Sequence, residues 1–118
     1  MKYMLLLNSD PAQAPAPGTD EGAAMMAKWF AYSDELVAAG AMVSGEALLG
    51  AETATTVTVR EGQRVVTDGP FIESKEVLGG YYVIDVADLD AALDWAAKIP
   101  NVHIGSVEVR PVMDLSGL

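Results

Sequence analysis

The chain has 118 residues, and this length predicts one domain, residues 1–118, large enough to fold without a disulfide or a metal. It contains no cysteine, which excludes a disulfide framework, a thiolate zinc site and a cysteine nucleophile. A formal net charge of -10 disfavours nucleic acids and anionic membranes as partners. The sequence shows neither a signal peptide nor a bilayer-spanning apolar stretch, so we expect a cytoplasmic protein.

The N-terminal part of the chain predicts a strand, a loop and a helix. Residues 2–8 are apolar on both faces, which favours a strand buried on both sides. The proline-rich run SDPAQAPAPG predicts a loop, and Thr19 or Asp20 is expected to cap the helix that follows. This helix spans Gly22 to Ala39 and ends at Gly40. Its two adjacent apolar rows are Met26, Phe30, Ser33 and Val37, and Met25, Trp29, Tyr32 and Leu36.

The rest of the chain combines short β-branched or aromatic runs with one further amphipathic helix. The predicted elements are a strand over 41–48, a hairpin over 55–67 with EGQ at its turn, a strand over 80–86, a helix over Leu89–Ile99 capped by Asp88, and a strand over 104–110 closed by Pro111 at a sheet edge. The expected core stripe of the second helix is Leu89, Ala92, Leu93 and Ala96.

The order of these elements predicts an α+β fold, the ferredoxin-like split βαβ arrangement with an inserted β-hairpin. Both helices should cover one face of an antiparallel sheet. The first strand and the strand over 80–86 are nevertheless apolar on both sides, so the second face also needs a cover. Because most oligomers are two-fold symmetric, we expect a homodimer in which the two sheets face each other.

Three segments resemble the YCII-related family, and most closely its DGPF-motif branch. They are the start MKYMLLLN, the run VTDGPFIESKEVLGGYYVIDVADLDAALDWAAKIP and the ending VEVRPVMDL, which together span nearly the whole chain. DGPF followed by E-x-K-E and then GGYYVID is a far more specific signature than the tetrapeptide alone. The resemblance implies a dimeric α/β barrel, which is a ferredoxin-like fold paired through its sheets.

The resemblance also bears on activity. Some family members carry a histidine–aspartate pair in a pocket, but the two positions fall here on Trp29 and on Ile99 before Pro100, so this pair is absent. Members of the DGPF branch tend to be encoded near, or fused to, sigma factors of the extracytoplasmic-function type. This association implies an accessory or regulatory role as an alternative to catalysis.

The segment TDGPFIESKE, residues 67–76, carries the first candidate site residues. In a structural interpretation, Asp68 to Pro70 form a turn and Phe71 fills the core. In a functional interpretation, Asp68 lines a pocket as a general base, which requires burial to raise its pKa. Lys75 is either part of a solvated charged connection or the anchor for an acidic ligand.

Aromatic and charged side chains elsewhere are the remaining candidates. Trp29 and Tyr82 fit either core packing or an aromatic pocket wall. Glu46 and Arg110 lie on strands whose register decides whether they are buried and paired or solvated. His103, the only histidine, lacks a partner motif, so a structural role is expected and no metal site is predicted.

These observations lead to two hypotheses. In the first, a homodimer without a cofactor binds a small organic molecule between helix, sheet and the 68–76 segment. It could then catalyse a simple lyase, isomerase or dehalogenase-like step, with Asp68 as acid or base. In the second, the protein is a non-catalytic accessory of a sigma-factor system. The proposed ligand-binding residues are Lys75, Arg110, Glu46, Trp29, Tyr82 and Phe71.

Overall fold

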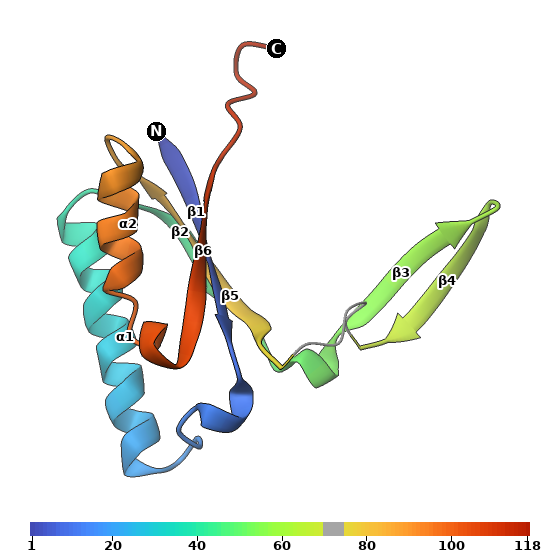
Figure 1. Ribbon diagram of the computed structural model, residues 1–118, viewed down its shortest axis with the longest axis horizontal. Helices are drawn as coiled ribbons and strands as arrows, with labels where there is room; N and C mark the ends of the chain where they lie inside the picture. The colour runs from blue at the N-terminus through green and yellow to red at the C-terminus, as the bar shows by residue number, and fades with distance from the viewer. Residues whose placement is uncertain (70–74) are drawn as a thin grey trace.

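The computed structural model describes residues 1–69 and 75–118. In this part of the chain six strands and two α-helices follow one another with short 3-10 turns between them (Figure 1). Their bounds are β1 (Lys2–Ser9), α1 (Asp20–Ala38), β2 (Met42–Ala47), β3 (Thr55–Arg60), β4 (Gln63–Asp68), β5 (Val77–Asp85), α2 (Leu89–Ala97) and β6 (Gly105–Pro111). The predicted α+β class, with a hairpin inserted into a ferredoxin-like order, is confirmed.

One four-stranded antiparallel sheet forms the body, in the order β2-β5-β1-β6. The apolar β1 therefore lies inside the sheet, and β6 is an edge strand, which suits the proline at its end. Both helices lie on the same side of this sheet, as the sequence predicted (Figure 1). Neither helix in the described ranges is long and apolar enough to cross a membrane.

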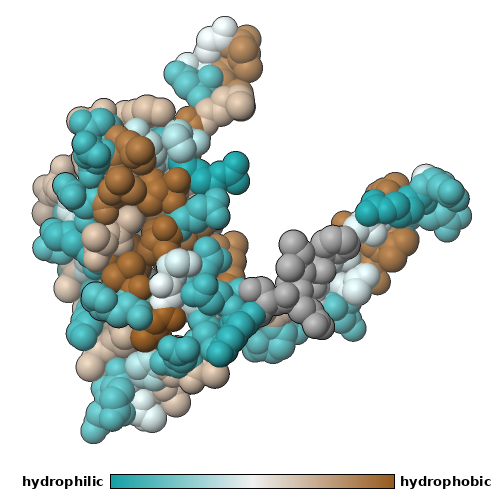
Figure 2. Space-filling view, viewed as in Figure 1, coloured by the Kyte–Doolittle hydropathy of each residue, from teal (hydrophilic) through white to brown (hydrophobic). Residues whose placement is uncertain are grey.

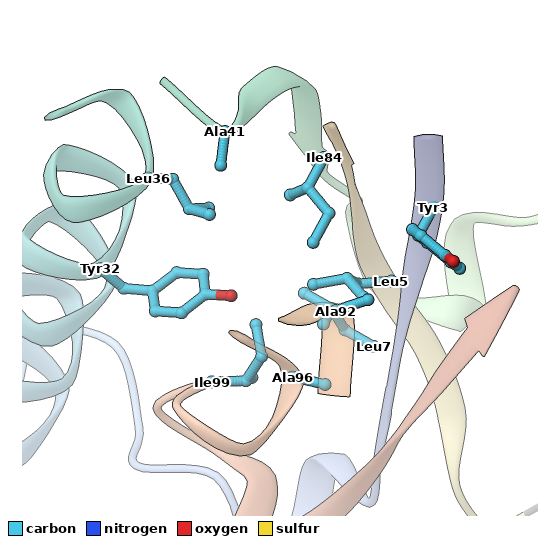
Figure 3. Close-up of a cluster of buried hydrophobic side chains, with 10 residues drawn as sticks. All are labelled: Tyr3, Leu5, Leu7, Tyr32, Leu36, Ala41, Ile84, Ala92, Ala96 and Ile99. Carbon is cyan, nitrogen blue, oxygen red and sulfur yellow. The ribbon is translucent and has the colours of Figure 1, made fainter. Parts of the chain in front are cut away.

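The hydrophobic core lies between this sheet and the two helices (Figure 3). Leu5, Leu36 and Ile84 are fully buried and join β1, α1 and β5. The other buried apolar residues are Tyr3, Leu7, Tyr32, Ala41, Ala92, Ala96 and Ile99. Close packing of this layer fixes the distance between α1 and the sheet. It therefore also fixes the space that remains between the helix and the sheet beyond the packed layer.

Only one of the two predicted apolar rows of α1 is buried. Tyr32 and Leu36 enter the core, whereas Phe30 is 65% and Val37 64% exposed. The row of Phe30 and Val37 is exposed in the single chain because a helix on a sheet buries one narrow stripe. In α2 the two alanines of the predicted stripe are likewise buried, while Leu89 and Leu93 are about half exposed.

The helix ends follow their local signals. The Thr19 side chain accepts a hydrogen bond from the backbone N–H of Gly22, so Thr19 is the cap of α1. Gly40 has a φ of 71° just beyond α1, and the N–H of Ala41 donates to the carbonyl of Leu36, which closes the helix in a Schellman motif. Asp88 caps α2 as predicted.

The face of the sheet opposite the helices carries apolar residues at its centre. Met4 pairs with Val83, and Leu6 pairs with Tyr81, all on this face and all only partly buried. The register places Glu46 beside Tyr81 and Arg110 beside Met4, so both charged candidates lie at the edges of this face. The prediction that β1 is buried on both sides holds only for the helix side in the single chain.

The β3–β4 arm, residues 55–68, stands away from the body (Figure 1). Its strands pair only with each other and meet at a two-residue turn in which Glu61 and Gly62 have φ of 52° and 76°. The radius of gyration is 16.4 Å, whereas a compact chain of this length has roughly 13–14 Å. The arm carries about half-exposed valines, some of them visible in Figure 2: Val57, Val59, Val65 and Val66.

The buried phenol of Tyr32 leads to a prediction about alkaline stability. Its hydroxyl donates to the carbonyl of Trp95 at 2.8 Å, and burial raises the pKa of Tyr32 above its ordinary 10.0. Because this folded-state pKa is raised, the phenol ionises first in the unfolded chain. Its contribution to stability is therefore complete below about pH 10 and is lost as pH rises through the folded-state pKa.

We expect Tyr32→Phe to lower the free energy of unfolding by about 1 kcal/mol near neutral pH, and to reduce the further loss above about pH 10. Urea unfolding at several pH values from about 8 to 11 measures both effects. All other side chains are the same in both proteins, so the difference between the two curves isolates Tyr32. Parallel curves over this range would contradict the prediction.

Candidate ligand pocket between α1 and the sheet

A cavity of about 480 Å³ lies between α1 and the β2–β5 side of the sheet. This volume falls within the range of small-molecule sites, roughly 300–1,000 Å³. Helix α1 contributes Met26, Trp29, Phe30 and Ser33, strand β2 contributes Met42 and Gly45 to Ala47, strand β5 contributes Gly79 to Tyr82, and Leu7, Ser9 and Asn101 complete the described lining. The predicted pocket residues Trp29 and Tyr82 therefore come together at this cavity, whereas the pairing of Glu46 with Tyr81 places the Glu46 side chain on the opposite face of the sheet.

Tyr82 is the centre of an aromatic group at this cavity. Its ring is stacked with that of Trp29, with centroids 6.5 Å apart and planes 19° apart. On its other side it meets the buried ring of Tyr32 edge-on at 5.4 Å. Tyr82 packs against the core and also lines the cavity, and its contact with a ligand stays a prediction.

The Tyr82 hydroxyl forms a hydrogen bond of 2.8 Å with the hydroxyl of Ser33, in which either group can donate. This pair joins α1 to β5 across the cavity lining. Ser33 was counted in the sequence as a member of an apolar helix row, and its role was missed. The usable signal was a lone hydroxyl within that row, since a polar group on a packed face needs a partner.

Gly45 allows the Tyr82 ring to lie over β2. The two residues are paired in the sheet, and a Cβ atom at Gly45 would lie 2.8 Å from Cδ1 of Tyr82 and 3.2 Å from the carbonyl oxygen of Tyr81. A side chain here would push the ring away and separate its hydroxyl from Ser33. Gly80 has a similar constraint, because its Cβ would lie 2.7 Å from the carbonyl oxygen of Glu46.

The polar groups that face the cavity are uncharged hydroxyls. Glu46 is the one acidic or basic residue among the described lining residues, and its pairing with Tyr81 places its exposed side chain on the opposite face of the sheet. The hydroxyls of Ser33 and Tyr82 line the cavity and are hydrogen-bonded to each other. The cavity therefore offers apolar and aromatic surface and a hydroxyl pair.

The other candidates lie elsewhere. Asp68 ends β4 in the arm, opposite Thr55, and is exposed. Lys75 is exposed between the arm and β5, and Arg110 lies on β6 with its Nε 3.6 Å from a carboxylate oxygen of Glu108. None of these candidates is among the described residues that line the cavity. Their contact with a ligand stays a prediction.

Two further residues named from the sequence are placed as follows. Phe71 lies outside the described residues. His103 is exposed in the short 3-10 turn Val102–Ile104 between α2 and β6. Of the two positions at which some relatives carry histidine and aspartate, Trp29 lines the cavity, and Ile99 is buried in the core.

Residues 1–116 match the family model described as the YCII-related domain. The chain belongs to the YCII-related family. An uncharacterized protein of Rhizobium meliloti is 37% identical over 114 residues, which cover 95% of this chain and 92% of that protein. The family membership predicted from the sequence is thus confirmed, and its DGPF branch is compatible with these matches.

A solved structure with a similar fold is 5-chloro-2-hydroxyhydroquinone dehydrochlorinase from Burkholderia phenoliruptrix in complex with 2,5-dihydroxybenzoquinone. The TM-score is 0.54, and the match covers 96% of this chain and 94% of that chain at 12% sequence identity. At this identity the likeness shows the shared fold of this YCII-related protein and that enzyme.

The close approach of Gly45 to Tyr82 can be tested by substitution. Gly45→Ala should displace the Tyr82 ring, break its hydrogen bond to Ser33 and lower the free energy of unfolding by about 1–3 kcal/mol. Gly79→Ala is the matched control, because it also lines the cavity but a Cβ there meets only the carbonyl oxygen of Leu7 at 4.0 Å. Denaturant unfolding of both variants measures the difference, and equal losses would contradict this role of Gly45.

Proposed function

We propose that this YCII-related protein binds a small organic molecule in the cavity between α1 and the sheet. The observation that carries the proposal is the combination of a cavity of about 480 Å³ with an aromatic wall and the Ser33–Tyr82 hydroxyl pair. Pockets for small molecules in general combine apolar walls with a few convergent polar groups. The fold is also shared with a dehydrochlorinase whose complex holds 2,5-dihydroxybenzoquinone, a ring-sized molecule.

A cofactor-free lyase, isomerase or dehalogenase-like step is part of the proposal. Such a step needs a group that accepts or donates a proton within hydrogen-bond reach of the ligand. Among the described lining residues, the Ser33–Tyr82 hydroxyl pair can supply it. Asp68 remains the acid or base proposed from the sequence. Lys75 or Arg110 remains the group proposed to orient an anionic part of the ligand.

The alternative of a non-catalytic accessory to a sigma-factor system rests on different features. It expects no small-molecule pocket and relies on an exposed apolar or acidic surface. The described cavity favours the small-molecule proposal over this alternative. The net charge of -10 and the exposed valines of the arm fit either proposal, so they do not discriminate.

The homodimer remains part of the proposal, because two surfaces of the single chain lack a cover. One is the sheet face with Met4, Leu6, Tyr81 and Val83. The other is the β3–β4 arm, which extends from the body on the side away from the helices (Figure 1). A two-stranded hairpin is marginally stable in water by itself, so the arm needs a surface to pack on. We infer that the arm packs on a second copy that covers the open sheet face.

A thermal-shift screen of small aromatic and carboxylic metabolites tests the binding site. A ligand of the cavity should raise the melting temperature of the wild type and lose most of that shift in Trp29→Ala, which removes part of the wall. Arg64→Ala, in the arm, is the control and should keep the shift. The same ligand applied to Asp68→Asn, Lys75→Ala and Arg110→Ala tests the roles proposed from the sequence, and unchanged shifts would reject them.

The arm offers two neighbouring positions that test the dimer. Val66 pairs with Val57 on one face of the arm, and Thr67 pairs with Thr56 on the other. We expect Val66→Glu to shift the protein toward the monomer in light scattering at micromolar concentration, because it places a charge on an apolar contact surface. Thr67→Glu adds the same charge on the opposite face and should leave the dimer intact. A wild-type protein that is already monomeric would refute the proposed assembly.

A further inference from the structure

We propose that two copies of this chain pack their open sheet faces about a two-fold axis that runs perpendicular to the strands, so that Arg110 of each copy meets the partner's Glu108. This inference rests on the proposed homodimer and adds the orientation of the two copies and the charge pairs that select it. The observations that carry it are the register of the open face and the positions of its charges.

The open face carries two rows of side chains that run across the four strands. In the order β2, β5, β1 and β6, the first row consists of Ser44, Val83, Met4 and Arg110, and the second row consists of Glu46, Tyr81, Leu6 and Glu108. The two central residues of each row are apolar and partly buried, whereas the outer residues are polar or charged and exposed. An apolar centre with a polar rim is the usual composition of a protein–protein interface.

An axis perpendicular to the strands gives this face a complementary partner. Packed sheets keep their strands aligned, so an axis in the interface runs either perpendicular or parallel to the strands. The perpendicular axis places the first row of one copy opposite the second row of the other. The apolar centres then meet, and the Arg110–Glu108 contact between copies forms twice because the interface is isologous. Within one chain the Nε of Arg110 lies 3.6 Å from a carboxylate oxygen of Glu108, and both side chains are more than half exposed, so each can reach a partner.

An axis parallel to the strands brings like charges together. It places each row opposite the same row, with β6 of one copy over β2 of the other. Glu108 then faces the partner's Glu46, also twice, and like charges opposed across an interface weaken it. Lys2 and Asp85 would attract each other across this axis, but they are exposed one row beyond the apolar centre, where water and salt screen them. The register therefore favours the perpendicular axis.

Charge reversals on β6 test the orientation, with the Kd of the dimer measured by analytical ultracentrifugation of a dilution series. Arg110→Glu and Glu108→Arg should each raise this Kd at least about tenfold, because each opposes like charges across the perpendicular axis. The double variant exchanges the two charges and restores both pairs, so its Kd should lie within about threefold of that of the wild type. Lys28→Glu is the control, since it makes the same charge change as Arg110→Glu at an exposed position of α1, on the other side of the sheet. It should change the Kd by less than about twofold.

The possible outcomes separate the orientation from the homodimer on which it rests. A Glu108→Arg dimer as tight as the wild type, or tighter, would overturn the inference, because on the parallel axis the new arginine faces the partner's Glu46. A double variant as weak as the single variants, or equal weakening by Lys28→Glu and Arg110→Glu, would also overturn it and leave the homodimer in place. A monomeric wild type would overturn both. Circular dichroism and the melting temperature establish that each variant is folded before its Kd is measured.

Discussion

The packing of both helices on one face of β1 is the constraint on which the rest of the structure depends. Leu5, completely buried in the middle of β1, contacts a layer to which α1 contributes Leu36 and β5 contributes Ile84. This layer holds α1 at a fixed height over the sheet. The cavity exists because the helix continues past the packed layer toward the end where β2 and β5 carry glycines. The core thus determines where a ligand can bind.

The same sheet divides the chemistry of the chain between two faces. Tyr82, on the helix face, brings its hydroxyl to Ser33 above the backbone of Gly45. Its neighbour Tyr81 points to the other face with Leu6, where the residues are partly exposed and apolar. Two adjacent tyrosines therefore belong to different surfaces, one to the proposed binding site and one to the proposed dimer contact. This separation follows directly from the two-residue period of a strand.

Features with local signals could be predicted from the sequence, whereas features set by distant contacts could not. The cap at Thr19 and the helix end at Gly40 were predictable because each depends on a few neighbouring residues. Whether Phe30 or Tyr32 faces the core depends on the rotation of α1 over the sheet, which two adjacent apolar rows leave open. The Ser33–Tyr82 bond joins residues 49 positions apart, so local pattern gives no access to it.

The β3–β4 arm also has a consequence for how this sequence can change over time. Its described residues contribute nothing to the buried core cluster, and its turn at Glu61 and Gly62 is at the tip. Insertions or replacements near that tip therefore leave the folding of the body almost unaffected. The length and composition of the arm can therefore vary among homologous proteins without loss of the folded protomer. New segments can be inserted at its tip for the same reason.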